Sequence, residues 1–238
     1  MLKARIKFRK YGVMKFIGHL DLMRFFQKAM RRAEIPIAFT GGYSPHMIMS
    51  FAQPLGLGVT SDGEYLDIEL TESISSQKAV EQLNSAMVEG IEILSFLQIP
   101  DDRKQSGMTI VSAADYRVTL LESHKTADVT LKIPEHWKDR ANAFLSQPHI
   151  TVWKKTKKSE KEVDIRQMIY EMRVEERYIY LCLAAGSEQN LKPDLVMEAF
   201  LTFMGEDAAK IPLHYHRLEI YTHRESFVPL DTLGQIIR

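Results

Sequence analysis

The chain has 238 residues, of which 45% are hydrophobic and 26% charged, an ordinary composition for a soluble globular protein with room for one large domain or two small ones. Its 31 Lys and Arg balance 31 Asp and Glu, so no overall field attracts it to nucleic acid or membrane. No apolar run reaches the ~18 residues of a membrane helix, and the chain does not open on a secretory leader. We therefore expect a cytoplasmic protein without membrane contact.

The opening residues predict a strand with one basic face. Apolar and basic residues alternate over Leu2–Arg9, the period that places successive side chains on opposite sides of a strand. Like charges along one strand face repel each other unless an anion or acidic neighbours offset them, and residues 60–102 are rich in Asp and Glu. We expect an exposed surface that binds anions. Its four basic residues are Lys3, Arg5, Lys7 and Arg9.

The next residues predict an amphipathic helix that starts near His19 and ends before Pro36, because the residue preceding a proline is pushed out of the helical region. Asp21 lies in its first turn, where the helix dipole favours a carboxylate. The opposite face is either an ordinary solvated face or an extension of the cationic surface. The apolar stripe consists of Leu22, Phe25, Phe26, Ala29 and Ala33, and the basic face of Arg24, Lys28, Arg31 and Arg32.

The first hundred residues predict the order strand, helix, strand, strand, helix, strand. This is the split βαβ, ferredoxin-like arrangement, in which two helices cover one face of an antiparallel sheet. The polar segment 100–107 is the predicted linker, so the first domain is expected over residues 1–100. The later elements of this domain are predicted as strands at 35–39, 64–70 and 91–99 and a helix at 75–88, with an apolar run at 47–51.

The second half repeats this order without a visible sequence repeat, so a second ferredoxin-like domain is expected over residues 108–238. The fold class is α+β, with two tandem ferredoxin-like domains and antiparallel sheets. The single cysteine, Cys182, lies in an apolar run and is predicted to be a small buried hydrophobe. Strands are predicted at 116–121, 129–133, 150–154, 163–172, 178–184 and 214–221, helices at 135–145 and 193–204, and a basic hairpin tip at 154–161.

Two histidines and one aspartate are the candidate catalytic residues: His19, Asp21 and His46. A histidine at a helix start is a possible general base or acid, although His19 and Asp21 equally suit a helix cap. The segment 41–46 is no phosphate-binding loop because it lacks the Gly-Lys-Ser/Thr ending. It offers Tyr43 for stacking, or it simply connects two strands.

Two further patterns are less specific. His214 and His216 share one strand face, which is compatible with a metal, but no third ligand lies nearby in the sequence, so no metal or other cofactor is expected. Arg217 and Glu219, like Asp164 and Arg166, look like ordinary charge alternation along a strand face.

These residues resemble the uncharacterised radical-SAM-linked protein family, a domain either fused to a radical SAM protein or encoded separately. The resemblance spans most of the chain and is most specific in the first third. The chain departs from the family at three places: Gly18 stands where the family has serine, Ser44 where it has asparagine, and Met47-Ile48-Met49 where it has a basic or proline pair. The matching segments are Phe16–Arg24, Met30–Ala33, Gly42–His46, Ser50–Phe51, Pro54–Val59 and Glu64–Ile68, with looser matches at Val163–Arg166, Lys192–Asp194 and Arg217.

The resemblance implies a radical SAM partner. One cysteine cannot hold the three-cysteine cluster of such enzymes, so any radical chemistry belongs to that partner. Our first hypothesis is an accessory module, without catalysis of its own, that presents the basic residues and Tyr43 to tRNA or ribosomal RNA during modification. The alternatives are a metal-independent endoribonuclease using His19, or a protein-interaction subunit that docks through Met47–Met49.

Overall fold

The computed structural model describes residues 2–122, 130–155 and 160–238 of the chain. The chain is a mixed α+β protein that divides into two compact units. Unit 1 comprises Met1–Ala113 and Arg217–Arg238, and unit 2 comprises Ala114–His216. None of the helices formed by the described residues is long and apolar enough to cross a membrane.

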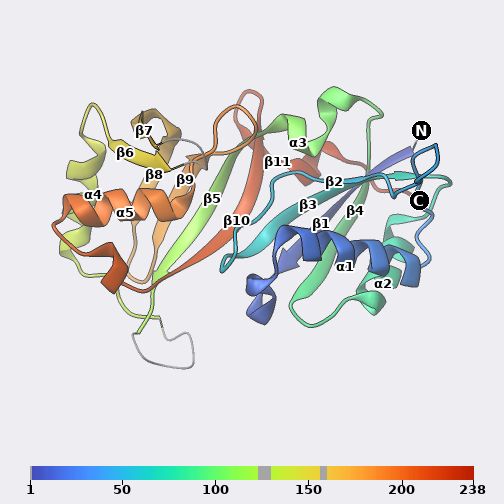
Figure 1. Ribbon diagram of the computed structural model, residues 1–238, viewed down its shortest axis with the longest axis horizontal. Coiled ribbons are helices and arrows are strands. Elements are labelled where there is room, and N and C mark those ends of the chain that lie inside the picture. The colour runs from blue at the N-terminus through green and yellow to red at the C-terminus, as the bar shows by residue number, and fades with distance from the viewer. Residues whose placement is uncertain (1, 123–129, 156–159) are drawn as a thin grey trace. The chain divides into compact units, whose positions relative to one another are not determined.

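Unit 1 is built around three neighbouring antiparallel strands in the order β4-β1-β3, and both β2 and β10 also pair with β3. Figure 1 shows α1 and α2 on one face of these strands. The elements of unit 1 are β1 (Leu2–Lys10), α1 (His19–Arg32), β2 (Met49–Phe51), β3 (Thr60–Leu70), α2 (Ser76–Ala86), β4 (Ile91–Ile99), α3 (Gly107–Ile110), the start of β5 (Val111–Leu120), most of β10 (Leu213–His223) and β11 (Phe227–Pro229).

The core of unit 1 confirms the predicted periodicities of the first strand and the first helix. Ala4, Ile6 and Phe8 of β1 are fully buried among residues that include Leu22 and Phe26 of α1. Because β1 alternates, its four basic residues extend from the face opposite these helices. The helices α1 and α2 therefore do not cover these four basic residues.

One predicted strand is absent. Residues 35–39 form only isolated bridges, Ile37 with Leu70 and Phe39 with Met47. A strand that was not predicted, β2, lies in the apolar run 47–51 instead. The backbone N–H of Ala38 still bonds to the carbonyl of Glu69. The segment therefore runs beside β3 without a regular ladder, because Pro36 has no N–H to donate.

Unit 2 has the strand order β10-β5-β9-β8, and its helices α4 and α5 pack on each other through Trp137, Phe144 and Phe200. Cys182 is buried, as predicted, and burial raises the pKa of its thiol to about 12. The further elements are α4 (His136–Leu145), β6 (Thr151–Lys155), β7 (Glu160–Asp164), β8 (Ile169–Val174), β9 (Ile179–Ala184) and α5 (Pro193–Phe203).

The hairpin predicted near residue 154 is formed by β6 and β7, and residues 156–159 at its tip lie outside the described residues. Val129, the first residue of another predicted strand, also lies outside them. The described remainder of that strand, 130–133, forms only a bridge between Leu121 and Thr130.

The compact units divide the chain differently from the expected domains, 1–100 and 108–238. The C-terminal segment returns to unit 1, where Gln235 pairs with Gln98 and Ile237 enters the core. The expected linker also belongs to unit 1, because the carbonyl of Gln105 and the N–H of Gly107 contact side chains of β1 and β3. The polar composition of segment 100–107 predicted a linker. Two of its backbone groups instead bind the buried charged side chains of Arg5 and Asp67.

Gly63 in β3 has no room for a side chain. A Cβ there would lie 2.7 Å from the Cα of Glu219 and 2.8 Å from the carbonyl oxygen of Leu218. We expect Gly63→Ala to lower the free energy of unfolding by about 1–3 kcal/mol, since β10 has to shift. Urea unfolding measures this. The matched control Gly41→Ala enters open space, and an equal loss in both variants would contradict the packing argument.

Candidate nucleic-acid interface

The four basic residues of β1 do not form an exposed cationic surface. Each is paired with acidic side chains, and all the acidic partners belong to unit 1. The pairs are Lys3 with Glu69 and Asp101, Arg5 with Asp67, Lys7 with Glu219 and Asp231, and Arg9 with Asp62 and Glu92.

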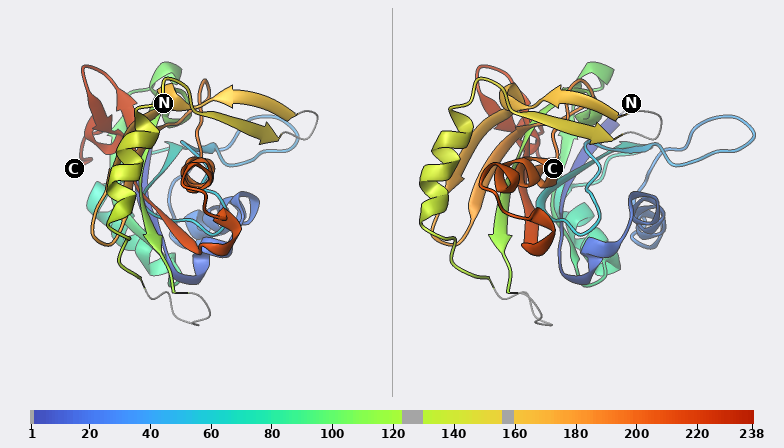
Figure 2. Two further views of the ribbon diagram at one scale, coloured as in Figure 1. Left: turned by 90° about the vertical axis from the view of Figure 1, so that its left-hand side faces the viewer. Right: turned by 60° about the vertical axis from the view of Figure 1, so that its left-hand side comes forward.

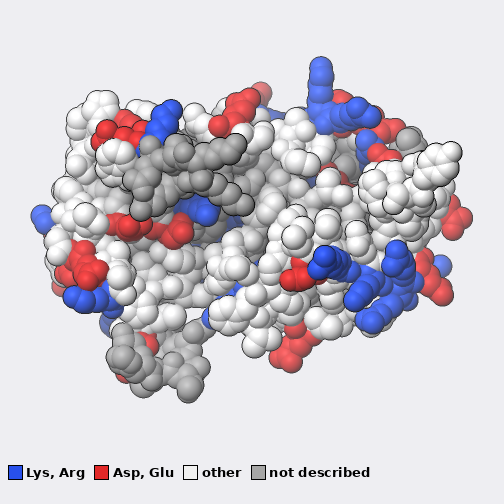
Figure 3. All heavy atoms as spheres, viewed as in Figure 1, with Lys and Arg blue, Asp and Glu red and all other residues white. Residues whose placement is uncertain are grey.

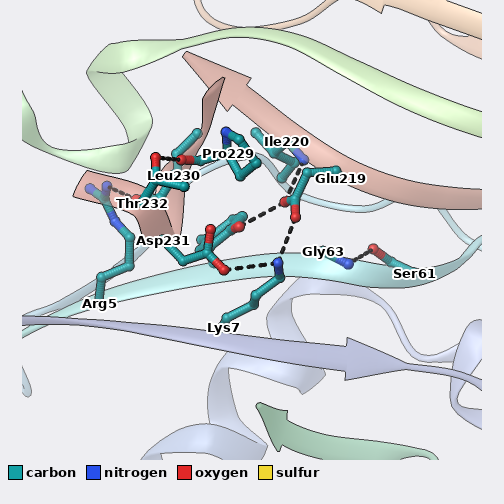
Figure 4. A network of polar contacts seen from close by, with 11 residues as sticks. Arg5, Lys7, Ser61, Gly63, Glu219, Ile220, Pro229, Leu230, Asp231 and Thr232 are labelled. Atoms are coloured by element: carbon teal, nitrogen blue, oxygen red, sulfur yellow. Dashed lines mark hydrogen bonds and ion pairs between the residues drawn. The ribbon is translucent and has the colours of Figure 1, made fainter. Parts of the chain in front are cut away.

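Arg5 is the most buried of the four, with 1% of its surface exposed. Its Nε and Nη2 donate to the two carboxylate oxygens of Asp67 at 2.7 and 2.9 Å, the bidentate geometry of a strong charged pair. Its remaining donors reach the carbonyls of Leu230 and Gln105. Figure 4 shows Arg5 directed at the C-terminal segment. Arg5 therefore joins chain segments and cannot reach a phosphate.

Lys7 is the centre of a second network, also drawn in Figure 4. Its Nζ donates to Glu219 at 2.5 Å and to Asp231 at 3.0 Å, and the hydroxyl of Tyr65 donates to the other oxygen of Glu219. Burial alone would lower the pKa of Lys7, but the two carboxylates outweigh it and the pKa is raised. Lys7 is a cation held between two anions.

The outer two cations of β1 are more exposed but also paired. The hydrogen bond that Lys3 donates to Asp101 is the main reason that the pKa of Lys3 is raised, and the hydrogen bond that Arg9 donates to Asp62 does the same for Arg9. The prediction that this strand face is an exposed, uncompensated cationic surface is therefore wrong. The acidic residues of the middle segment, together with Glu219 and Asp231, already offset these charges.

A second buried charge cluster was not predicted. Arg217 donates to both oxygens of Glu64 at 2.8 and 2.6 Å and to the carbonyl of Gln53, and both charged side chains are 2% exposed. Lys10 is equally buried, and its Nζ donates to the carbonyl of Ile17. Burial lowers the pKa of Lys10, while Glu64 raises it and Arg217 lowers it further.

The sequence did contain a signal for this cluster. Lys10 breaks the alternation of β1, where the pairing with β3 shifts register after Phe8. A basic residue in the apolar phase of a strand is a sign of a buried partner. Its partner Glu64 is fifty-four positions away, so the pair itself was not visible.

The basic face of α1 is the cationic surface that remains exposed. Lys28, Arg31 and Arg32 are exposed, and within the described part of the chain no acidic side chain pairs with them. Arg24 is exposed and lies 3.4 Å from Asp21 in a weak surface pair. Figure 3 shows lysine and arginine side chains gathered over α1. We call Arg24, Lys28, Arg31 and Arg32 the α1 basic face.

The loop 40–46 is exposed throughout its glycine-rich part. Tyr43 is fully exposed, and Gly42 has φ +98°, a conformation that favours glycine. His46 closes the loop, because its ring Nδ1 lies 3.1 Å from the Thr40 hydroxyl oxygen and its backbone N–H donates to the same oxygen. The histidine thus shapes the loop, and Tyr43 is free to stack on a ligand.

The structure does not join the candidate catalytic residues. His19 packs edge-on against Phe51 at 5.2 Å, Asp21 pairs with Arg24, and His46 bonds to Thr40. No hydrogen bond links two of the three candidates within the described residues. They do not form a catalytic pair in this structure.

Two other predicted surfaces fare differently. Met47 is buried and Met49 packs against the core, so the proposed docking segment is not an open apolar surface. Across the described residues, no group of three His, Cys, Asp or Glu side chains is placed to hold a metal ion, and His214 and His216 are part of no such group. Asp164 is not simple strand-face alternation, since its carboxylate binds His149 and two backbone N–H groups.

Comparisons with known proteins place the chain in a family and include a distant solved structure. Residues 3–193 match the model of a family described as "Uncharacterized protein conserved in bacteria (DUF2344)". No curated protein matches the chain. A chain from "Crystal Structure of a Cbf5-Nop10-Gar1 Complex" is similar, with 10% identity and a TM-score of 0.45. The match covers 93% of this chain and 50% of that one, and we draw no conclusion about function from it.

Proposed function

The chain belongs to the family of uncharacterized proteins conserved in bacteria (DUF2344), and we propose that it is an RNA-binding module that contacts phosphates through the α1 basic face. The observation that carries the proposal is the contrast between two sets of cations. Those of β1 are paired with carboxylates, whereas Lys28, Arg31 and Arg32 are exposed without such a partner in the described part of the chain. The chain as a whole has zero net charge, so the positive charge of these helix cations is a local excess.

The size of this surface limits the affinity. Four cations on one helix face neutralise at most about four phosphates, and a single-stranded RNA then gives a salt slope of roughly −3. Tyr43 adds a stacking surface that tolerates any base. Binding through this surface alone is therefore expected to be weak, with little sequence preference and with strong salt dependence.

The module is proposed to act beside an enzyme rather than as one. The resemblance to the radical-SAM-linked family supports a radical SAM protein as the partner, with a tRNA or ribosomal RNA as the shared substrate. His19, Asp21 and His46 each contact another residue and not one another within the described residues, which favours this over hydrolysis by the chain itself.

We also propose that both units are ferredoxin-like. What supports this in unit 1 is the strand order β4-β1-β3-β2 with α1 after β1 and α2 after β3. Unit 2 has the corresponding order β10-β5-β9-β8 with α4 after β5 and α5 after β9. The order β-α-β-β-α-β is that of the split βαβ arrangement.

The test removes charge from α1 without changing helix propensity. We expect Lys28→Gln/Arg31→Gln/Arg32→Gln to weaken binding of a single-stranded RNA on the order of 100-fold at 0.1 M salt and to flatten the salt slope by about 2. Glutamine is as good a helix former as lysine or arginine, so the fold should persist. Filter binding over a salt series measures both quantities.

The matched control removes three exposed charges elsewhere in unit 1, by Lys78→Gln/Arg103→Gln/Lys104→Gln. We expect this variant to bind RNA within about twofold of the wild type, since it retains the α1 basic face. Equal losses in the two triple variants, or wild-type affinity that ignores salt, would refute the proposed function.

A further inference from the structure

Unit 2 contains a groove that the proposed function does not use. The groove has a volume of about 540 Å³ and lies between α5 and the β6 strand of the hairpin, with the end of α4 as its floor. Figure 2 shows the hairpin β6–β7 beside α5. This volume is within the range of ~300–1,000 Å³ typical of small-molecule sites. We call it the α5 groove.

The apolar part of the α5 groove is aromatic. Phe144 and Phe203 contact each other with ring centroids 5.6 Å apart, and both line the groove together with Trp153. Trp153 is 64% exposed, whereas the other tryptophan, Trp137, is buried. A large exposed indole beside a concave aromatic surface is a platform for a flat ring, because every heteroaromatic base has a π-face to stack.

The polar lining of the groove includes His149, whose ring is held by Asp164. Asp164 accepts hydrogen bonds from the backbone N–H groups of Arg166 and Ile150 and lies 2.7 Å from Nδ1 of His149. The N–H of Arg166, followed by His149 and the N–H of Ile150, lowers the pKa of Asp164 to about 2, so this carboxylate is ionised. The contact with Asp164 fixes the orientation of the His149 ring, which lines the groove.

Glu198 of α5 is the carboxylate that lines the groove. It is exposed and has no hydrogen bond or ion pair among the residues that the structure describes. Its charge acts on a neighbouring group: the pKa of Tyr215 is raised mainly by burial, then by Asp194 and then by Glu198. A carboxylate beside an aromatic platform favours a ring that carries N–H donors and disfavours a phosphate.

We propose that the α5 groove binds one unpaired nucleobase, stacked on Trp153, with an exocyclic amino group donated to Glu198. This inference rests on the proposed function, because it places the flat part of a single-stranded RNA in unit 2 and its phosphates elsewhere. It predicts a preference for adenine, cytosine and guanine over uracil, which is the one base of the four without an exocyclic amino group. The groove would thus supply the base recognition that the α1 basic face does not.

The test uses nucleosides, which carry no phosphate, with the full chain. Adenosine and cytidine are expected to quench Trp153 emission saturably, with uridine binding about tenfold more weakly and ribose not at all. Ligand-observed NMR gives the affinities of variants that lack the indole. We expect Trp153→Ala to weaken adenosine binding by about 5- to 150-fold, and Glu198→Gln to remove most of the preference over uridine.

The control is Phe16→Ala, which removes another exposed aromatic ring outside the groove; it is expected to bind adenosine like the wild type. Absence of nucleoside binding, or binding that Trp153→Ala leaves unchanged, overturns the inference. If RNA binding still follows salt and the α1 charges in that case, the proposed function stands alone. If nucleosides bind while the α1 triple variant retains its RNA affinity, the nucleobase site in the groove is supported and the proposed phosphate-binding role of the α1 basic face is refuted.

Discussion

Glu64→Gln is expected to lower the free energy of unfolding by about 3–5 kcal/mol, because it removes one partner of a buried ion pair. Arg217 and Lys10 both lie at 1–2% exposure beside this carboxylate. The bidentate charged pair with Arg217 would be lost, because a glutamine amide presents one neutral oxygen acceptor in place of two charged ones. Two buried cations would then remain without the anion that offsets them.

The pH dependence identifies the contribution of Lys10. Burial already lowers the pKa of this amine below its unfolded value, and loss of Glu64 lowers it further. Between the lowered folded pKa and the unfolded value, the unfolded chain binds more protons, so stability rises with pH. The difference between wild type and Glu64→Gln should therefore narrow as the pH is raised from neutral toward the unfolded pKa of lysine.

Urea unfolding at neutral and alkaline pH measures both effects. Glu72→Gln is the matched control, since Glu72 is exposed, and it should change stability by less than about 0.5 kcal/mol. Adding Lys10→Met to Glu64→Gln should recover part of the loss and remove the added pH dependence. A Glu64→Gln variant as stable as the control, or one whose deficit grows with pH, would contradict this account.

The elements that could be predicted are those with a local signal. The residues Leu22, Phe26 and Ala29 recur at helical spacing and form the buried stripe of α1, and the predicted strand at 91–99 is β4. Hydrophobic periodicity reports which side of an element is apolar, and it does so within a few turns. The prediction of a strand at 35–39 was wrong, because Pro36 and the following loop leave only isolated bridges in this segment.

The candidate site could be predicted only in part, because charge pairing is not local. The partners of Arg5 and Lys7 lie 62, 212 and 224 positions away. A strict alternation of apolar and basic residues occurs both in strands whose basic face is solvated and in strands whose basic face is covered by acidic segments. The local sequence pattern therefore does not distinguish these two cases. The α1 basic face kept its predicted exposure because no described segment with acidic side chains covers it.

Arg5→Met separates the two interpretations of the β1 cations. We expect it to cost about 3–5 kcal/mol, since Asp67 would keep only the N–H of Gly107 while remaining buried. The C-terminal segment would also lose the contact from Arg5 to the carbonyl of Leu230. Replacing both partners, Arg5→Met/Asp67→Leu, should be less destabilising than Arg5→Met alone, because it leaves no unpaired charge in the interior. Urea unfolding of the three proteins gives the comparison.

The decisive measurement combines this stability series with RNA binding. At a temperature where Arg5→Met remains folded, its RNA affinity should equal that of the wild type, because the guanidinium already binds Asp67 and two carbonyls. Lys3→Met in the same strand should cost less than about 1 kcal/mol, since its pairs are near the surface. If Arg5 instead contacted phosphate, its loss would weaken binding about fivefold at 0.1 M salt and flatten the salt slope by about 0.7. That result would return the RNA surface to β1, and with it the requirement that the acidic partners move away when RNA binds.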